Sequence, residues 1–124
     1  MNTLAIDVGG TKFTLAAFEG DRMVLRESQA TDREAGRDWM LPRLSSIARD
    51  WQQRMRFDHC GIGFGGPVNY QTQRVALSTH AGGWNDFDFP AFIRSELGLQ
   101  SVMDNDANVG GLGEGAHGAG LGLR

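Results

Sequence analysis

The sequence predicts an α/β domain in which an antiparallel meander is followed by alternating helices and strands. Near the start, three segments rich in strand-forming side chains are joined by short glycine-containing turns. Farther along, apolar residues recur at helical spacing between short apolar runs that are typical of buried strands. The three strand-like segments are residues 3–8, 12–19 and 22–29, with Gly20-Asp21 as the second turn.

A helix is expected between residues 34 and 56, where apolar side chains recur at steps of three and four. A proline fits only the first turn of a helix, so Pro42 predicts that the regular helix begins near Leu41. We interpret the apolar stripe as core packing. The stripe consists of Met40, Leu44, Ile47, Trp51 and Met55.

The second half of the chain alternates between strand and helix signals. Residues 59–64 are typical of a buried strand that runs into Gly65-Gly66-Pro67. Residues 72–78 suggest an extended piece, residues 79–87 a loop, and residues 101–103 another strand, after which a helix is expected from Ala107.

A short amphipathic helix is predicted from Phe89 to Leu97. Asp88 suits the N-cap, Pro90 the first turn and Gly98 the end of the helix.

Composition limits the possible functions. The 124 residues fit one domain, 1–124, and the 18 glycines follow no collagen period. A single cysteine, Cys60, excludes an internal disulfide framework and a multi-cysteine zinc site. The net charge of −3, with no basic stripe, argues against nucleic acid as a partner. No apolar run is long enough to span a bilayer and no signal peptide is apparent, so we expect a cytoplasmic protein.

The segment Asp7-Val8-Gly9-Gly10-Thr11-Lys12 is the first candidate site. Two glycines let consecutive backbone N–H groups form a concave nest for phosphate oxygens. Asp7 could then hold hydrated Mg²⁺, and Thr11 and Lys12 could meet the phosphate. A plain hairpin turn explains the same residues equally well. Lys12 is the only lysine in the chain, which favours phosphate.

The segment Asp104-Asn105-Asp106-Ala107-Asn108 is the second candidate site, placed where a strand ends and a helix can begin. A carboxylate there can take a proton from a substrate hydroxyl, and the neighbouring amide can anchor other hydroxyls. Taken alone, these residues are better explained as an N-cap cluster, for which Asp and Asn are preferred.

Other motifs carry less information. Two glycine patterns match G-x-G-x-x-G, but neither has the strand-loop-helix context that a dinucleotide site needs. The first runs into Pro67 and an extended stretch, and the second lies inside a helix-like segment at the chain end. The histidines are too scattered for a metal site. We interpret His59 and Cys60 as strand interior. Trp84 could stack on a sugar face, but anchoring of a loop is the commoner explanation. The two glycine patterns are Gly61-x-Gly63-x-x-Gly66 and Gly113-x-Gly115-x-x-Gly118.

Taken in order, four motifs resemble the amino-terminal domain of ROK-family sugar kinases, and most of all the bacterial glucokinases. They are D-V-G-G-T-K, G-I-G-F-G-G-P-V, G-W-N-D-F-D-F-P-A-F-I-R-S-E-L-G-L, and D-N-D-A-N followed by L-G-E and G-A-H-G-A-G. The resemblance spans essentially the whole chain. It implies a ribonuclease-H-like fold of the actin and hexokinase ATPase type, a mixed sheet with an initial three-stranded antiparallel meander and flanking helices.

The resemblance also implies roles for individual residues. Asp106 would be the general base, and Asn105, Gly65 and Gly66 would bind the sugar. The reaction would transfer the γ-phosphoryl group of ATP to a hydroxyl of a hexose, with glucose the first candidate. The residues implied for ATP phosphate and Mg²⁺ are Asp7, Gly9, Gly10, Thr11 and Lys12.

The second domain of such kinases carries further phosphate and sugar contacts and usually a zinc motif, and none of these is present in this chain. We therefore expect an amino-terminal half that is inactive alone and that pairs with a missing carboxy-terminal kinase domain. The alternative is a non-catalytic sugar-sensing or regulatory module of the same family. An exposed interdomain face would favour a homo-oligomer.

Overall fold

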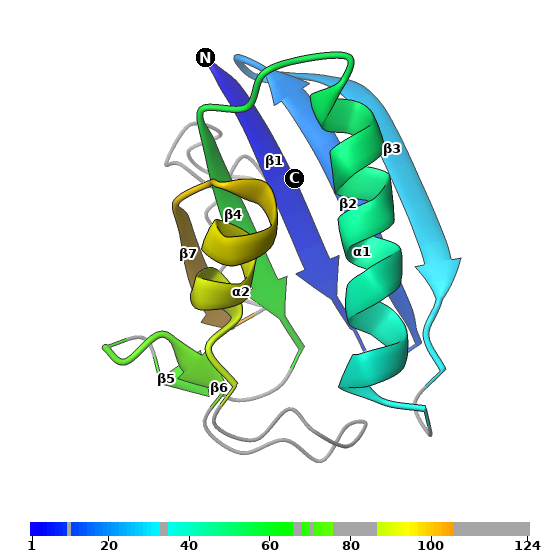
Figure 1. The fold of residues 1–124 in the computed structure, drawn as a ribbon, viewed down its shortest axis with the longest axis vertical. Coiled ribbons are helices and arrows are strands. Elements are labelled where there is room, and N and C mark those ends of the chain that lie inside the picture. The colour runs from blue at the N-terminus through cyan, green and yellow to red at the C-terminus, as the bar shows by residue number, and fades with distance from the viewer. Residues whose placement is uncertain (10, 33–34, 66–67, 70, 76–86, 106–124) are drawn as a thin grey trace.

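A mixed five-stranded sheet forms the centre of the protein (Figure 1). The computed structural model describes the chain except for residues 10, 33–34, 66–67, 70, 76–86 and 106–124. The strand order is β3-β2-β1-β4-β7. These strands are β1 (Asn2–Val8), β2 (Lys12–Glu19), β3 (Arg22–Ala30), β4 (His59–Phe64) and β7 (Ser101–Asn105).

The predicted meander is confirmed. β1 pairs antiparallel with β2, and β2 pairs antiparallel with β3. The turn between β2 and β3 contains Gly20 at φ +62°, a conformation that glycine adopts without steric cost. β4 and β7 then add to the other side of β1, and both β1–β4 and β4–β7 are parallel pairs.

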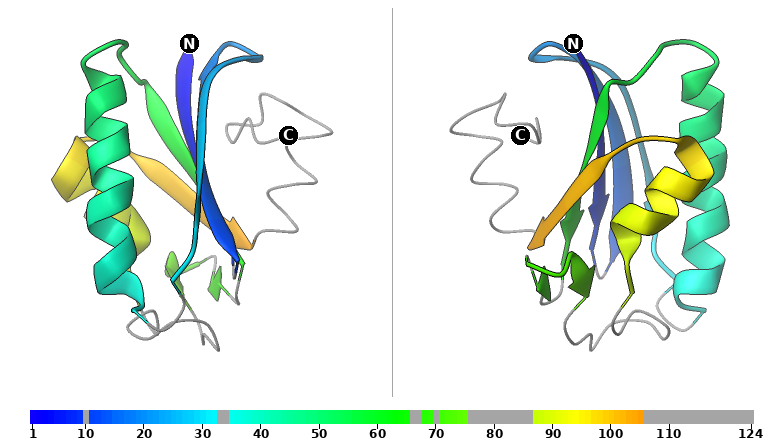
Figure 2. Two further views of the ribbon diagram at one scale, coloured as in Figure 1. Left: turned by 90° about the vertical axis from the view of Figure 1, so that its right-hand side faces the viewer. Right: turned by 60° about the vertical axis from the view of Figure 1, so that its left-hand side comes forward.

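Two helices, α1 (Arg37–Gln52) and α2 (Phe89–Leu97), lie on the same face of the sheet (Figure 2). Alternate residues of each strand point to this face and pack against the helices. The predicted apolar stripe packs into this core, with Ile47 and Met55 partly buried at its margin. The expected end of the helix is wrong, because α1 ends at Gln52 and Met55 lies beyond it. The buried core includes Leu4, Ile6, Val8, Phe13, Leu15, Met40, Leu44, Trp51, Ile62, Phe64, Phe89, Ile93 and Met103.

The predicted start of the first helix is wrong. α1 begins at Arg37, four residues before Leu41, and Pro42 lies inside the helix. Pro42 has no N–H to donate to the carbonyl of Asp38, one turn earlier. Both residues are exposed, so water can hydrate that carbonyl and the helix tolerates the proline.

The prediction for α2 is confirmed at both ends. The Asp88 side chain accepts a hydrogen bond from the Ala91 N–H at 2.9 Å, and Pro90 stands in the first turn. Gly98 ends the helix in the left-handed conformation, at φ 71°, and its N–H donates to the Arg94 carbonyl.

A small hairpin, β5 (Val68–Asn69) with β6 (Arg74–Val75), lies between β4 and α2. The extended piece predicted at 72–78 is therefore correct at Arg74–Val75 and wrong at 72–73, which belong to the turn. β7 runs to Asn105, two residues beyond the prediction. Residues 76–86 and the helix expected from Ala107 lie outside the described residues. Among the described helices, none has the length and apolar character that a membrane crossing needs.

Candidate active site

The three parallel strands β1, β4 and β7 end side by side. Val8 is in register with Phe64, and Phe64 with Asn105, so the carboxyl ends of the three strands share one edge of the sheet. The Gly65 N–H then donates to the Val8 carbonyl at 2.7 Å, which extends the pairing into the loop after β4. Ligands of open α/β sheets bind beyond this edge, and the described residues of the two candidate segments lie at or beside it.

The β1–β2 connection is a tight hairpin loop. The Gly9 N–H donates to the Lys12 carbonyl at 2.9 Å, and a Cβ on Gly9 would lie only 3.1 Å from the same oxygen. Gly10 lies outside the described residues. The Gly9 N–H is thus used within the loop, and a phosphate nest would draw on N–H groups that follow it. The side chains of Thr11 and Lys12 are exposed at the loop surface.

Thr31, which sequence reasoning missed, anchors this loop from the end of β3. Its N–H donates to the Thr11 carbonyl at 2.9 Å, and its hydroxyl donates to the Gly9 carbonyl at 3.3 Å. The loop is therefore held by its own hydrogen bond and by Thr31. A lone threonine after a strand carries no sequence signal for such a role.

Asp7 points to the sheet face opposite the helices, because its neighbours Ile6 and Val8 belong to the helix-side core. In register it faces Gly63 on β4, and Gly63 in turn faces Asp104 on β7. Glycine places no side chain between Asp7 and Asp104, whose backbone positions lie two strand spacings apart, roughly 10 Å. Oδ1 of Asp7 is buried.

Asp7 fits the role of a magnesium ligand. Mg²⁺ in nucleotide sites is commonly held by one or two carboxylates together with phosphate oxygens and water. Within the part of the chain that the structure describes, no three His, Cys, Asp or Glu side chains gather as a metal-binding group. A site built on Asp7 could take phosphate oxygens of a nucleotide and water as further ligands.

Asn105 is the last residue of β7, which places it at the shared strand edge. Gly65 reaches the same edge from β4. The structure therefore brings together Asp7, the Gly9–Lys12 loop, Gly65 and the backbone of Asn105. Gly66 and Asp106 lie outside the described residues, so their predicted roles stay predictions.

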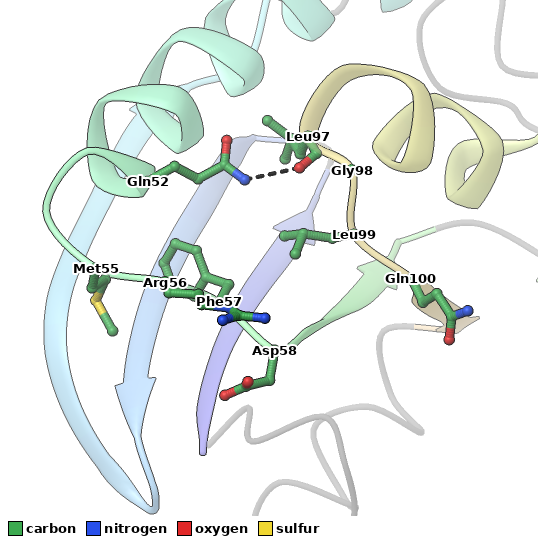
Figure 3. A pocket seen from close by; sticks show the side chains of 9 residues that line it. All are labelled: Gln52, Met55, Arg56, Phe57, Asp58, Leu97, Gly98, Leu99 and Gln100. Atoms are coloured by element: carbon green, nitrogen blue, oxygen red, sulfur yellow. Dashed lines mark hydrogen bonds between the residues drawn. The ribbon is translucent and has the colours of Figure 1, made fainter.

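A pocket of about 450 Å³ lies at the opposite end of the sheet (Figure 3). It opens where the chain enters β4 and β7, and the Gln52 side chain crosses it to donate to the Leu97 carbonyl at 2.9 Å. This bond joins the carboxyl ends of the two helices. The pocket is therefore distinct from the strand edge that carries the candidate residues. Its lining is Gln52, Met55, Arg56, Phe57, Asp58, Leu97, Gly98, Leu99 and Gln100.

The interpretation of His59 and Cys60 as strand residues is confirmed, since both belong to β4. Cys60 is buried, and its burial raises the pKa of the thiol far above the usual range, so the group stays protonated and is a poor nucleophile. His59 is half-buried and shares a hydrogen bond of 3.0 Å with the Thr3 hydroxyl. His80, His117 and Trp84 lie outside the described residues.

Comparison with known proteins identifies the family. The sequence matches the model of the ROK family over residues 3–124. The chain belongs to the ROK family. Among its relatives, the glucokinase of Halalkalibacterium halodurans is 30% identical over 132 residues. The alignment covers 98% of this chain and 38% of that glucokinase, so this ROK chain spans well under half the length of the relative.

Solved structures agree with this assignment. The ROK family glucokinase of Streptomyces griseus, in complex with glucose and AMPPNP, superposes with a TM-score of 0.81 at 25% identity, over 98% of this chain and 38% of that one. The ROK hexokinase of Thermus thermophilus superposes with a TM-score of 0.80 at 24% identity, over 98% and 40% of the two chains. The expected actin-like ATPase fold is thereby confirmed for this ROK domain.

Proposed function

We propose that this chain supplies the sugar-binding side and part of the phosphate-binding side of an ATP-dependent hexose kinase, with glucose as the substrate. One observation carries the proposal. The in-register ends of β1, β4 and β7 bring the loop after Asp7, the loop at Gly65 and the segment at Asn105 to one edge. A phosphoryl donor and a hydroxyl acceptor must meet at one point, and this edge presents groups suited to both.

On the acceptor side, Asp106 would accept the proton of the sugar hydroxyl as it attacks phosphorus. Asn105 would orient the sugar, because a carboxamide can donate to one hydroxyl and accept from another. Gly65 and Gly66 would line the pocket with backbone only, which leaves room for a sugar ring. A base in this position contributes by being within hydrogen-bond reach of the reacting hydroxyl.

On the donor side, the loop from Gly9 to Lys12 would face the phosphates of ATP. The Lys12 ammonium and the Thr11 hydroxyl are exposed and can meet phosphate oxygens, and Gly10 would allow close approach of the backbone. Mg²⁺ bound with ATP supplies charge neutralisation for phosphoryl transfer. Asp7 would hold its hydrated shell from the end of β1.

The chain covers 38–39% of the glucokinases that it matches. We therefore propose that the adenosine contacts and further sugar contacts come from a carboxy-terminal domain, and that the isolated chain does not turn over. The proposed phosphoryl transfer would take place in the cytoplasm, where ATP is available. The isolated chain would also self-associate through the face that the carboxy-terminal domain would otherwise cover, which light scattering can test.

Titration of the isotope-labelled chain followed by NMR tests the assignment of the two sides. Glucose should shift the amide signals of Gly65 and Asn105, whereas AMPPNP with Mg²⁺ should shift those of Thr11 and Lys12. Sorbitol at equal concentration serves as the control for non-specific polyol effects. Glucose-induced shifts confined to the pocket near Gln100 would contradict the proposal.

A further inference from the structure

Gln73 makes an unusual contact with the edge strand β7. Its side-chain Nε2 donates to the Met103 carbonyl at 3.1 Å, and its Oε1 accepts from the Met103 N–H at 2.6 Å. A residue in a neighbouring antiparallel strand would offer the same donor and acceptor pair. The carboxamide thus occupies the place of a further strand beside β7.

The turn that contains Gln73 is held by hydrogen bonds to Asn69. Oδ1 of Asn69 accepts from the N–H groups of Gln71 and Thr72, and the Gln73 N–H donates to the Asn69 carbonyl at 2.8 Å. Gln73 itself has φ 60°, and among the described residues it is the one non-glycine residue with a positive φ. Glycine adopts this backbone conformation most easily. A glutamine at this position therefore indicates that its side chain has a role of its own.

The contact joins the two segments that the proposed sugar site needs. The β5–β6 hairpin follows directly on the loop at Gly65, and Met103 stands two residues before Asn105. Within the described residues β7 has a strand neighbour on one side only, β4. Loss of the Gln73 contact would remove the two hydrogen bonds that Met103 makes on the side of β7 away from β4.

We propose that Gln73 is a positioning residue. It fixes the carboxyl end of β7 relative to the loop at Gly65 and so sets the sugar-binding geometry. This inference rests on the proposed kinase function. A simple turn role is the alternative, and it makes the opposite prediction for glycine at this position. Glycine fits φ 60° better than glutamine does but cannot contact Met103.

Amide hydrogen exchange on the isolated chain tests the contact itself. In Gln73→Gly, the Met103 N–H should exchange at least tenfold faster, while the Ile6 N–H in the sheet centre keeps its protection. The Met103 N–H should exchange equally fast in Gln73→Asn, whose carboxamide is one methylene too short to reach it. Gln71→Ala changes an exposed residue of the same turn and should leave Met103 protected. Unchanged protection of Met103 in Gln73→Gly and Gln73→Asn would overturn the inference.

Kinetics of the chain joined to the carboxy-terminal kinase domain proposed above tests the positioning role. Gln73→Gly should raise KM for glucose severalfold with KM for ATP unchanged, and Gln73→Glu, which keeps the acceptor for the Met103 N–H, should fall between it and the native protein. Equal glucose KM in native and Gln73→Gly proteins would overturn the inference. Absence of glucose turnover in the native protein would instead refute the proposed function. The hydrogen-exchange result would still test the Gln73–Met103 contact independently.

Discussion

The Gly65 N–H donates to the Val8 carbonyl at 2.7 Å, and this bond ties the loop after β4 to the end of β1. The proposed sugar loop and the proposed phosphate loop therefore start from one fixed point. Small changes in either loop should alter ligand binding more than they alter the stability of the sheet.

Gly9→Ala should weaken both the β1–β2 loop and nucleotide binding. The added Cβ would lie 3.1 Å from the Lys12 carbonyl, which already accepts the Gly9 N–H. That oxygen must move by a few tenths of an ångström, at a cost of about 1 kcal/mol in the free energy of unfolding. Urea denaturation measures this cost, and titration with AMPPNP and Mg²⁺ measures the loss of affinity.

Gly20→Ala is the matched control at the other end of β2. Gly20 has φ +62° and no atom near its missing Cβ, so alanine there should also lower stability by about 1 kcal/mol, through backbone strain alone. Nucleotide affinity should stay at the native value. If both variants bind nucleotide equally well, the loop at Gly9 has no part in phosphate binding.

Asp88→Ala should destabilise the domain by about 1 kcal/mol, because the Ala91 N–H loses its capping acceptor. Asp88→Asn keeps a capping oxygen and should lose much less. Thermal or urea unfolding distinguishes the two. If both variants had the same free energy of unfolding as the native protein, the cap would contribute nothing to stability.

The helix α2 shows what local sequence can predict. Asp88, Pro90 and Gly98 each act within one turn of the chain, and both helix ends were predicted correctly. Pro42 shows the limit of such signals. It is a good start signal by itself, yet α1 begins five residues earlier, because burial of Met40 and Leu41 against the sheet stabilises the first turn.

Pro42→Ala should therefore stabilise the protein. Alanine restores an N–H for the Asp38 carbonyl and has a higher helix propensity, while the unfolded chain gains some conformational freedom. We expect a net gain of roughly 1 kcal/mol or more in the free energy of unfolding, measured by urea denaturation. A loss of stability would mean that the proline ring makes a packing contribution larger than the missing hydrogen bond.

Stability should fall at alkaline pH because of Cys60. Burial raises the pKa of its thiol in the folded state, whereas in the unfolded chain the thiol ionises near its usual value of about 8.5. The stabilisation is fully present below that pH and is lost above it, at up to about 1.4 kcal/mol per pH unit. Cys60→Ala removes this slope, so the difference between the two proteins from pH 7 to 10 isolates it.

The candidate site was only partly predictable. Strand-end positions such as Asp7 and Asn105 follow from local patterns, and their meeting follows from the parallel pairing of β1, β4 and β7. The contacts that support these positions cannot be predicted from local patterns. Thr31 acts on Gly9 across 22 residues and Gln73 on Met103 across 30, and neither a threonine nor a glutamine in a turn carries a signal for a partner that distant.

Glucose-dependent ADP formation by the chain joined to the proposed carboxy-terminal kinase domain, native and Asp106→Asn, tests the central claim most directly. The native protein should phosphorylate glucose. The variant should lose at least about a hundredfold in kcat, because asparagine cannot accept the hydroxyl proton, while calorimetry still detects glucose binding. Retention of native kcat in Asp106→Asn would contradict the account.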